Sequence, residues 1–146
     1  MSRYLKDFTP GQIYRTGKKR MDVADIKRFA REFDPQPFHL DEEAAKSSMF
    51  GGLAASGWHT AAMTMRMLVD SEFKAANGLI GAGFDELKWP KPVRPGDELR
   101  VEMEVLEARA SKSRPEMGFV KFRMTTLNQN GEAVQIGVCN LVVPTR

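Results

Sequence analysis

Three stretches in the second half of the chain alternate apolar and polar residues, and no other feature constrains the fold as much. They span residues 101–105, 120–125 and 134–138, and in each one the valine, isoleucine, methionine and phenylalanine side chains fall on a single face. A period of two is typical of a strand that is buried on one side, which favours an antiparallel sheet. Asn130-Gly131 predicts a hairpin turn between the last two strands.

Two further extended segments precede these strands. Residues 83–89 predict a fourth strand, because two prolines follow directly and end it. A Pro-Gly turn at residues 10–11 belongs to an extended lead-in, and residues 12–20 after it are expected to form another strand.

Helical periodicity occupies the part of the chain between these strands. Residues 23–33 place apolar side chains three and four positions apart, with Asp22 as the expected N-cap. Residues 42–46 predict a short second helix that Asp41 caps, with an acidic first turn that suits the helix dipole.

The longest apolar segment, residues 57–69, predicts a central helix that Ser56 caps. Arg66 is its one charged residue, and a helix that is apolar nearly all round is expected to be buried. The order of elements predicts a single α+β domain over residues 1–146, in which one long helix packs on a curved antiparallel sheet.

Composition and charge exclude several classes of protein. Charged residues make up 28% and hydrophobic residues 42% of the chain, a balance that argues against disorder. No apolar run is long enough for a membrane span or a signal peptide, so we expect a cytoplasmic protein. The net charge is only +3, and the basic cluster at residues 18–20 is expected to be a solvated strand end, not a nucleic-acid site. Cys139 is the one cysteine and is expected in the core.

Residues 33–40, Phe-Asp-Pro-Gln-Pro-Phe-His-Leu, carry an acid and a base on one short connection. Asp34 and His39 are five positions apart, with Pro35 and Pro37 between them. Because proline lacks an N–H and biases its predecessor toward extended geometry, we expect a stiff, non-helical connection. A carboxylate and an imidazole held in this way suit acid–base catalysis.

The spacing alone leaves a purely structural interpretation open. Asp-Pro is common turn chemistry, and His39 could be a hydrogen-bonded residue at a helix start. The other histidine, His59, follows Ser56 by three positions, but no Gly-x-Ser-x-Gly turn surrounds the serine, so a nucleophile pair is not expected. A metal site built from His39 and His59 is not expected either, because no recognisable ligand spacing accompanies them.

With these elements in place, the chain resembles the MaoC-like dehydratase family, the (R)-specific enoyl-CoA hydratases of the hotdog fold. Residues 34–39 match the family's Asp-x-Asn-Pro-x-His motif, and Gly57 matches its glycine at the start of the central helix. Residues 87–97 are also similar to the family's approach to its later strands. Two departures leave the choice of substrate open: Gln36 replaces the asparagine, and Ser56-Gly57-Trp58 stands where the family often has His-Gly-Met.

The resemblance implies an α+β hotdog fold and reversible syn hydration of a trans-2-enoyl-CoA to an (R)-3-hydroxyacyl-CoA. Asp34 and His39 would activate a water molecule, and the N–H of Gly57 would stabilise the thioester enolate. The residues expected to bind substrate are Gln36, Phe38, Ser56 and Trp58.

No metal or redox cofactor is implied, since coenzyme A enters as part of the substrate. The candidates to contact its phosphates are Lys88, Lys91, Arg94, Lys112 and Arg114. For each of them, ordinary surface charge is the expected role unless it proves to lie beside the site. A second copy of the chain is the expected partner, because hotdog sheets usually join edge to edge. No nucleic-acid or membrane partner is expected.

Two other functions fit the same fold. A hotdog thioesterase would need a carboxylate that faces the substrate carbonyl from the central helix, and residues 56–69 contain no aspartate or glutamate. A non-catalytic acyl-CoA binding protein would not need the Asp34/His39 pair, which is intact here.

Overall fold

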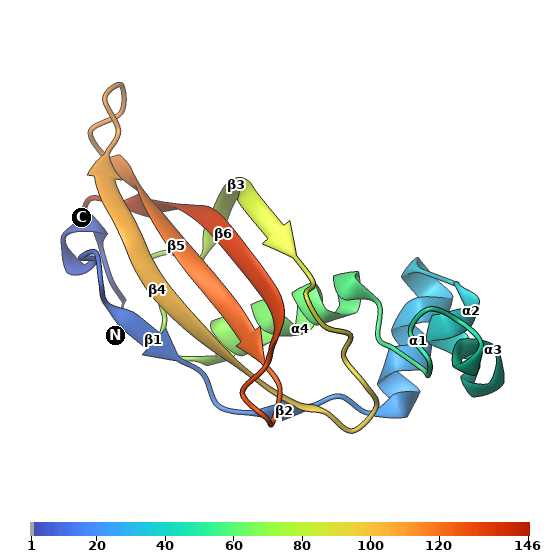
Figure 1. The fold of residues 1–146 in the computed structure, drawn as a ribbon. Coiled ribbons are helices and arrows are strands. Elements are labelled where there is room, and N and C mark those ends of the chain that lie inside the picture. The colour runs from blue at the N-terminus through green and yellow to red at the C-terminus, as the bar shows by residue number, and fades with distance from the viewer. Residues whose placement is uncertain (1) are drawn as a thin grey trace.

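A computed structural model describes residues 2–146 and has the predicted arrangement, an antiparallel sheet wrapped around one long helix (Figure 1). The strands are β1 (Ile13–Arg15), β2 (Lys19–Arg20), β3 (Ile80–Lys88), β4 (Glu98–Ala110), β5 (Met117–Leu127) and β6 (Ala133–Pro144). The helices are α1 (Val23–Phe33), α2 (Pro37–Leu40), α3 (Glu42–Lys46) and α4 (Gly57–Asp70), preceded by a 3-10 turn at Leu5–Asp7.

The sheet is antiparallel throughout, in the order β1-β4-β5-β6-β3, with β2 paired to β4 beside this path. The long helix α4 lies across one face of the sheet, and α1, α2 and α3 gather beyond its N-terminal end (Figure 1). This places the segment that contains Asp34 and His39 beside the start of α4.

Strands β4 and β5 bury the face that their alternation predicts. Val101, Met103 and Val105 on β4 are inaccessible to solvent, and the apolar residues of β5 face the same interior. They pack against Leu68 of α4 and Phe73 just beyond its end. The alternation was therefore a correct guide to both the strands and their buried face.

Strand β6 buries the face opposite to the one that its sequence suggests. Gln135, Gly137 and Cys139 point inward, whereas Ile136 and Val138 lie on the outer face. A register shift in the β5–β6 pairing explains the difference, because it leaves Val134 as an extra residue, and Val134 and Gln135 are both fully buried. A bulge of one residue inverts the facing of everything that follows it.

Helix α4 begins after Ser56, as predicted, and the Ser56 hydroxyl accepts a hydrogen bond from the N–H of Trp58. The expectation that it is buried all round is wrong for this single chain. Its inner face is buried, but Trp58, Met65 and Val69 are largely exposed. Since β3 is an edge strand and exposes Phe84, an apolar surface runs over the outer side of the helix and the neighbouring sheet edge.

The predicted helices at residues 23–33 and 42–46 have the predicted bounds. Asp41 caps α3 by accepting from Glu43 N–H. Asp22 stands at the predicted N-cap position of α1, but its side chain accepts no capping hydrogen bond and its Oδ1 lies 3.4 Å from Nε of Arg20. The prediction of a non-helical connection after α1 is wrong for residues 37–40, because α2 forms one helical turn there that contains His39. Pro37 occupies the first turn of α2, where its missing N–H has no intrahelical partner to lose.

The remaining strands differ from expectation mainly in length. The predicted strand at residues 12–20 is two short strands, β1 and β2, and the strand predicted at 83–89 begins three residues earlier as β3. Cys139 is buried as expected, and burial, together with Asp85, raises the pKa of its thiol to about 12. The thiol therefore stays protonated and unreactive at neutral pH.

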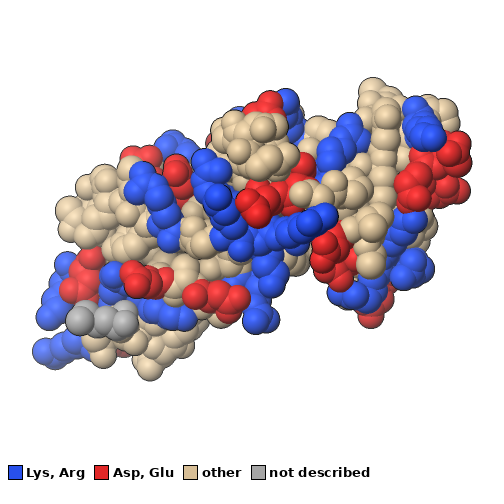
Figure 2. All heavy atoms as spheres, turned by 90° about the horizontal axis from the view of Figure 1, so that it is seen from below, with Lys and Arg blue, Asp and Glu red and all other residues tan. Residues whose placement is uncertain are grey.

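Charges of both signs are interspersed on the molecular face in Figure 2, with no broad field of one sign. In the basic segment 18–20, Lys18 lies 3.8 Å from Glu98 and Arg20 pairs with Asp22. Among residues 2–146, no helix is long and apolar enough to cross a membrane.

Candidate active site

His39 is held in one orientation by a backbone carbonyl. Its Nδ1 lies 2.6 Å from the carbonyl oxygen of Ala54, and the side chain is buried. A carbonyl oxygen only accepts hydrogen bonds, so Nδ1 must carry the hydrogen. In the neutral ring, the lone pair then lies on Nε2, which makes this nitrogen the atom able to take a proton.

Asp34 follows the last residue of α1 and is held by two side-chain donors. Gln36 Nε2 donates to Oδ1 at 2.6 Å, and Ser56 Oγ donates to Oδ2 at 2.7 Å. Burial alone would raise the pKa of Asp34, but these hydrogen bonds and the nearby His39 outweigh it, so the pKa lies below its ordinary value. Asp34 is therefore a carboxylate at neutral pH.

The two groups meet at a short distance, with Oδ2 of Asp34 3.3 Å from Nε2 of His39. If the ring is neutral, both atoms are acceptors, and a direct contact between two acceptors is unfavourable unless a hydrogen lies between them. A water molecule that donates one hydrogen to each atom satisfies both. With a neutral ring, the pair therefore offers two acceptor atoms to a donor bound beside it.

The start of α4 supplies a hydrogen-bond donor next to this pair. Ser56 Oγ accepts from Trp58 N–H, and the Ser56 carbonyl accepts from the N–H groups of His59 and Thr60. Gly57 is the first residue of the helix, so its N–H has no acceptor within the helix. It is the donor that this turn can offer to a bound oxyanion, and the helix dipole adds favourable potential there.

A cavity of about 490 Å³ opens at this place. His39 and Gly57 both line it, together with the rings of Phe38, Phe50 and Trp89. Largely apolar walls with a few convergent polar groups are typical of a small-molecule site.

The residues predicted to bind substrate are divided by the structure. Gln36 and Phe38 line the cavity, and Ser56 lies fully buried behind it, bonded to Asp34. Trp58 does not line the cavity, because its side chain is 59% exposed and packs edge-on against Trp89 with ring centroids 5.2 Å apart.

Sequence reasoning missed two parts of the site. The carbonyl of Ala54, which orients His39, carries no sequence signal because every residue has a carbonyl. Trp89 lines the cavity from the segment after β3, and its indole Nε1 donates to Gln135 on β6 at 2.9 Å. The alternation at residues 134–138 predicted that Gln135 faces outward, so this contact with Trp89 was not expected.

The five cations considered for phosphate binding lie in different places. Lys91 lines the cavity and pairs with Glu132, and Lys88 pairs with Glu86. Arg94 donates to the carbonyls of Phe50, Gly52 and Leu53 and so holds the loop before α4. Lys112 and Arg114 lie in the turn between β4 and β5, at the end of the sheet away from α1–α3 (Figure 1).

His59 takes no part in the cavity. Its ring stacks on Phe29 with centroids 4.7 Å apart, and Nδ1 finds no hydrogen-bond partner among residues 2–146. The Ser56 hydroxyl donates to Asp34, not to His59, which fits the rejection of a serine–histidine pair. Within the described part of the chain, no group of histidine, cysteine and carboxylate side chains is placed to hold a metal ion.

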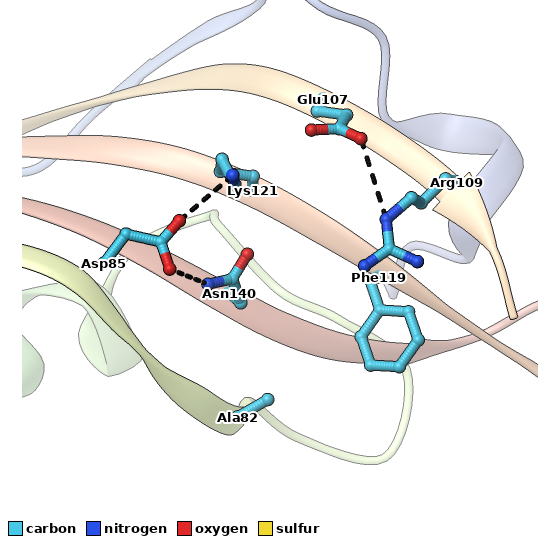
Figure 3. Close-up of a pocket in the computed structure, with 7 residues that line it drawn as sticks. All are labelled: Ala82, Asp85, Glu107, Arg109, Phe119, Lys121 and Asn140. Atoms are coloured by element: carbon cyan, nitrogen blue, oxygen red, sulfur yellow. Dashed lines mark hydrogen bonds and ion pairs between the residues drawn. The ribbon is translucent and has the colours of Figure 1, made fainter.

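A second recess, of about 380 Å³, lies on the outer face of the sheet (Figure 3). Its charged groups satisfy one another: Lys121 and Asn140 both contact Asp85, and Arg109 lies 3.6 Å from Glu107. Because these ionic groups are paired and exposed, the recess lacks the oriented acid–base pair of the first cavity. The cavity beside Asp34 and His39 is therefore the candidate active site.

Comparison with known proteins identifies relatives of the whole chain. A solved MaoC-like dehydratase from Rhodospirillum rubrum is 56% identical and has a TM-score of 0.96, with 99% of each chain covered. An R-hydratase from Pseudomonas aeruginosa is 26% identical with a TM-score of 0.77, covering 98% of this chain and 86% of the other. The uncharacterized protein YdeM of Bacillus subtilis is 34% identical over 95% of this chain and 97% of its own length.

These structural neighbours confirm the hotdog fold. The family pattern described as the MaoC like domain matches residues 7–126, which covers the predicted catalytic motif and the long helix. This chain therefore belongs to the MaoC-like domain family, whose structural neighbours include dehydratases and (R)-hydratases.

Proposed function

We propose that this protein catalyses the reversible syn hydration of a trans-2-enoyl-CoA to an (R)-3-hydroxyacyl-CoA. The observation that carries the proposal is the facing pair of acceptors, Asp34 Oδ2 and His39 Nε2, 3.3 Å apart beside a cavity. The (R)-hydratase among the structural neighbours supports the same chemistry.

The pair would hold and activate the attacking water. A water molecule that donates one hydrogen to Asp34 and the other to His39 keeps its oxygen lone pairs directed toward the substrate. As this oxygen bonds to the β-carbon, one of the two acceptors takes a proton from the water, and the electrons of the double bond move toward the thioester oxygen. General base catalysis of this kind contributes about 10²–10⁴ in rate.

The enolate formed in that step needs a donor and then a proton. The N–H of Gly57 would bind its oxygen, where a preorganised donor is worth about 10²–10³ in rate. The α-carbon takes back the proton held by the Asp34/His39 pair, which restores the resting groups. Hydroxyl and proton are delivered from the same side of the double bond, so the addition is syn.

The rival thioesterase reaction is less favoured by the positions of the carboxylates. Asp70 is the one acidic residue in α4, and it lies at the end of the helix that is remote from Gly57. Its Oδ2 lies 2.8 Å from Nε of Arg66. The helix therefore presents no carboxylate to a thioester carbonyl bound at Gly57.

The decisive experiment follows the loss of enoyl absorbance of crotonyl-CoA with wild-type protein, Asp34→Asn and His39→Ala. We expect hydration by the wild type and a loss of about 10²-fold or more in each variant. Melting curves for all three proteins establish that the variants remain folded. Release of free thiol in place of hydration would support the thioesterase, and folded variants with wild-type rates would contradict the proposed roles.

The proposed partner is a second copy of this chain. Strand β3 is an edge strand whose Ile80 and Phe84 are about half exposed, and Met65 and Val69 extend this apolar surface onto α4. An exposed apolar edge strand is a ready site for pairing. Light scattering of the purified protein is expected to give twice the monomer mass of 16.4 kDa. A monomer at micromolar concentration would contradict this assembly.

A further inference from the structure

The indole of Trp89 forms a wall that is packed directly on the start of α4. A Cβ atom added to Gly57 would lie 2.6 Å from Cε2 and 2.7 Å from Cδ2 of this ring. The absence of a side chain at Gly57 therefore lets the indole lie against the helix backbone. The hydrogen bond from Nε1 to Gln135 then ties the ring to strand β6.

Behind this wall lies a row of buried polar side chains, which we call the polar row: Gln135, Thr64 and Thr126. All three are inaccessible to solvent. Gln135 Nε2 donates to Thr64 Oγ1 at 3.3 Å, and the hydroxyls of Thr64 and Thr126 are 2.7 Å apart. Thr64 Oγ1 also donates to the carbonyl of Thr60, a residue that lines the catalytic cavity. Trp89 thus belongs to a continuous hydrogen-bonded partition between α4 and the sheet.

A second, apolar cavity lies beyond this partition. It has a volume of about 60 Å³ and is lined by Met65 and Leu68 of the second half of α4, with Phe122, Met124 and Cys139 of the sheet. The catalytic cavity is lined by Gly57 and Thr60 of the same helix. Thr64 follows Thr60 and precedes Met65 and Leu68 along α4, so the polar row lies beside the part of the helix that separates the linings of the two cavities.

An apolar chain gains little by entering the polar row. Its methylene groups would displace buried partners of Gln135 and the two threonines and leave those groups unsatisfied. It would also have to move an indole held by both packing and a hydrogen bond. A short acyl group ends before this barrier, whereas a longer one meets it.

We propose that Trp89, held by the polar row, restricts this enzyme to short-chain enoyl thioesters. This inference rests on the proposed hydratase function and adds the class of substrate to it. Trp89 is assigned as the residue that determines acyl length, without a part in the chemistry.

The test compares trans-2-octenoyl-CoA with crotonyl-CoA as substrates of wild type, Trp89→Ala and Gln135→Met. We expect the wild type to favour crotonyl-CoA in kcat/KM by at least about tenfold, since pocket length discriminates at about this level per excluded methylene. Trp89→Ala should reduce the preference in kcat/KM for crotonyl-CoA over trans-2-octenoyl-CoA, or reverse it. Gln135→Met removes the acceptor that holds the ring while keeping the core filled, and it should narrow the ratio less.

Cys139→Ala is the matched control, because the buried Cys139 lines the second cavity and its truncation enlarges that cavity without touching the partition. It should leave the preference for crotonyl-CoA unchanged. Melting curves and binding of the saturated analogues butyryl-CoA and octanoyl-CoA by calorimetry accompany each variant. The binding measurements report on pocket length even for a protein without turnover.

The outcomes separate this inference from the proposed function. If the wild type hydrates both enoyl-CoAs equally, or if Cys139→Ala alone admits the longer chain, the length restriction is wrong and the hydratase function stands. If neither enoyl-CoA is hydrated but butyryl-CoA binds more tightly than octanoyl-CoA, the hydratase function fails and the length restriction stands. If none of these thioesters binds or reacts, both are overturned.

Discussion

The two halves of α4 contribute to different parts of the molecule, the first to the candidate active site and the second to the apolar core. The first half carries Ser56, Gly57 and Thr60 into a network of directional hydrogen bonds around Asp34 and the cavity. The second half, beyond the polar row, buries Met67 and Leu68 in the apolar core. Directional hydrogen bonds hold the first half of the helix in place, whereas burial of apolar side chains holds the second. We therefore expect substitutions at the first end to affect chemistry and those at the second to affect stability.

The largest effect on stability is expected from Leu68→Ala in the apolar half. Leu68 is 1% exposed and borders the small cavity, so truncation enlarges a largely apolar void that offers water few hydrogen-bond partners. We expect the free energy of unfolding to fall by about 2–5 kcal/mol, measured by urea denaturation. Turnover of crotonyl-CoA per folded molecule should be unchanged. A large fall in kcat at a temperature where the variant is folded would show that the two halves are coupled.

Ser56→Ala tests the polar half with a smaller effect. Loss of the N-cap should cost about 1 kcal/mol of stability. Loss of the hydrogen bond to Oδ2 removes a group that favours the charged carboxylate, so the pKa of Asp34 should rise. Carboxyl-carbon NMR titration of Asp34 in wild type and variant measures this change.

Ser71→Ala is the control at the other end of the helix. Ser71 also makes two local hydrogen bonds, donating to the Leu68 carbonyl and accepting from Phe73 N–H. It should lower stability by a similar amount and leave the Asp34 titration as in the wild type. Equal shifts of the Asp34 pKa in both variants would mean that Ser56 affects this pKa only through the overall stability of the fold.

The smallest expected effect concerns His59, which is buried in the first half and whose ring Nδ1 has no hydrogen-bond partner among residues 2–146. Burial lowers the pKa of His59, with Asp25 opposing and Arg28 reinforcing the shift. Between this lowered value and the ordinary 6.5, the unfolded chain binds a proton that the folded chain does not. Stability is therefore lost as the pH falls through 6.5.

His59→Phe keeps a ring against Phe29 and removes the titrating group. Its urea midpoint should fall less than that of the wild type between mildly alkaline and mildly acidic buffer. If the urea midpoint falls equally in the two proteins, groups other than His59 cause the loss of stability in acid.

Local sequence determined most of the helix ends, the presence of the three long strands β4, β5 and β6, and the buried face of the first two. Asp41 and Ser56 are effective caps because a short polar side chain bonds to its own neighbouring N–H groups, whatever surrounds it. The alternation of β4 and β5 gave the right buried face because their pairing keeps both apolar stripes on one side. The motif at residues 34–39 likewise pointed to the acid–base pair before any distance was known.

Tertiary structure decided what depends on contacts between distant residues. Whether Gln135 faces inward is set by the bulge at Val134, which reflects pairing with β5 and not the composition of β6. The hydrogen on His39 Nδ1 is set by a carbonyl that lies 15 residues away, and the position of Trp89 is set by Gly57 and Gln135 on two other segments. Alternation and capping are local properties that a sequence displays directly. Facing after a bulge, tautomer and cavity walls arise only when separate segments pack together.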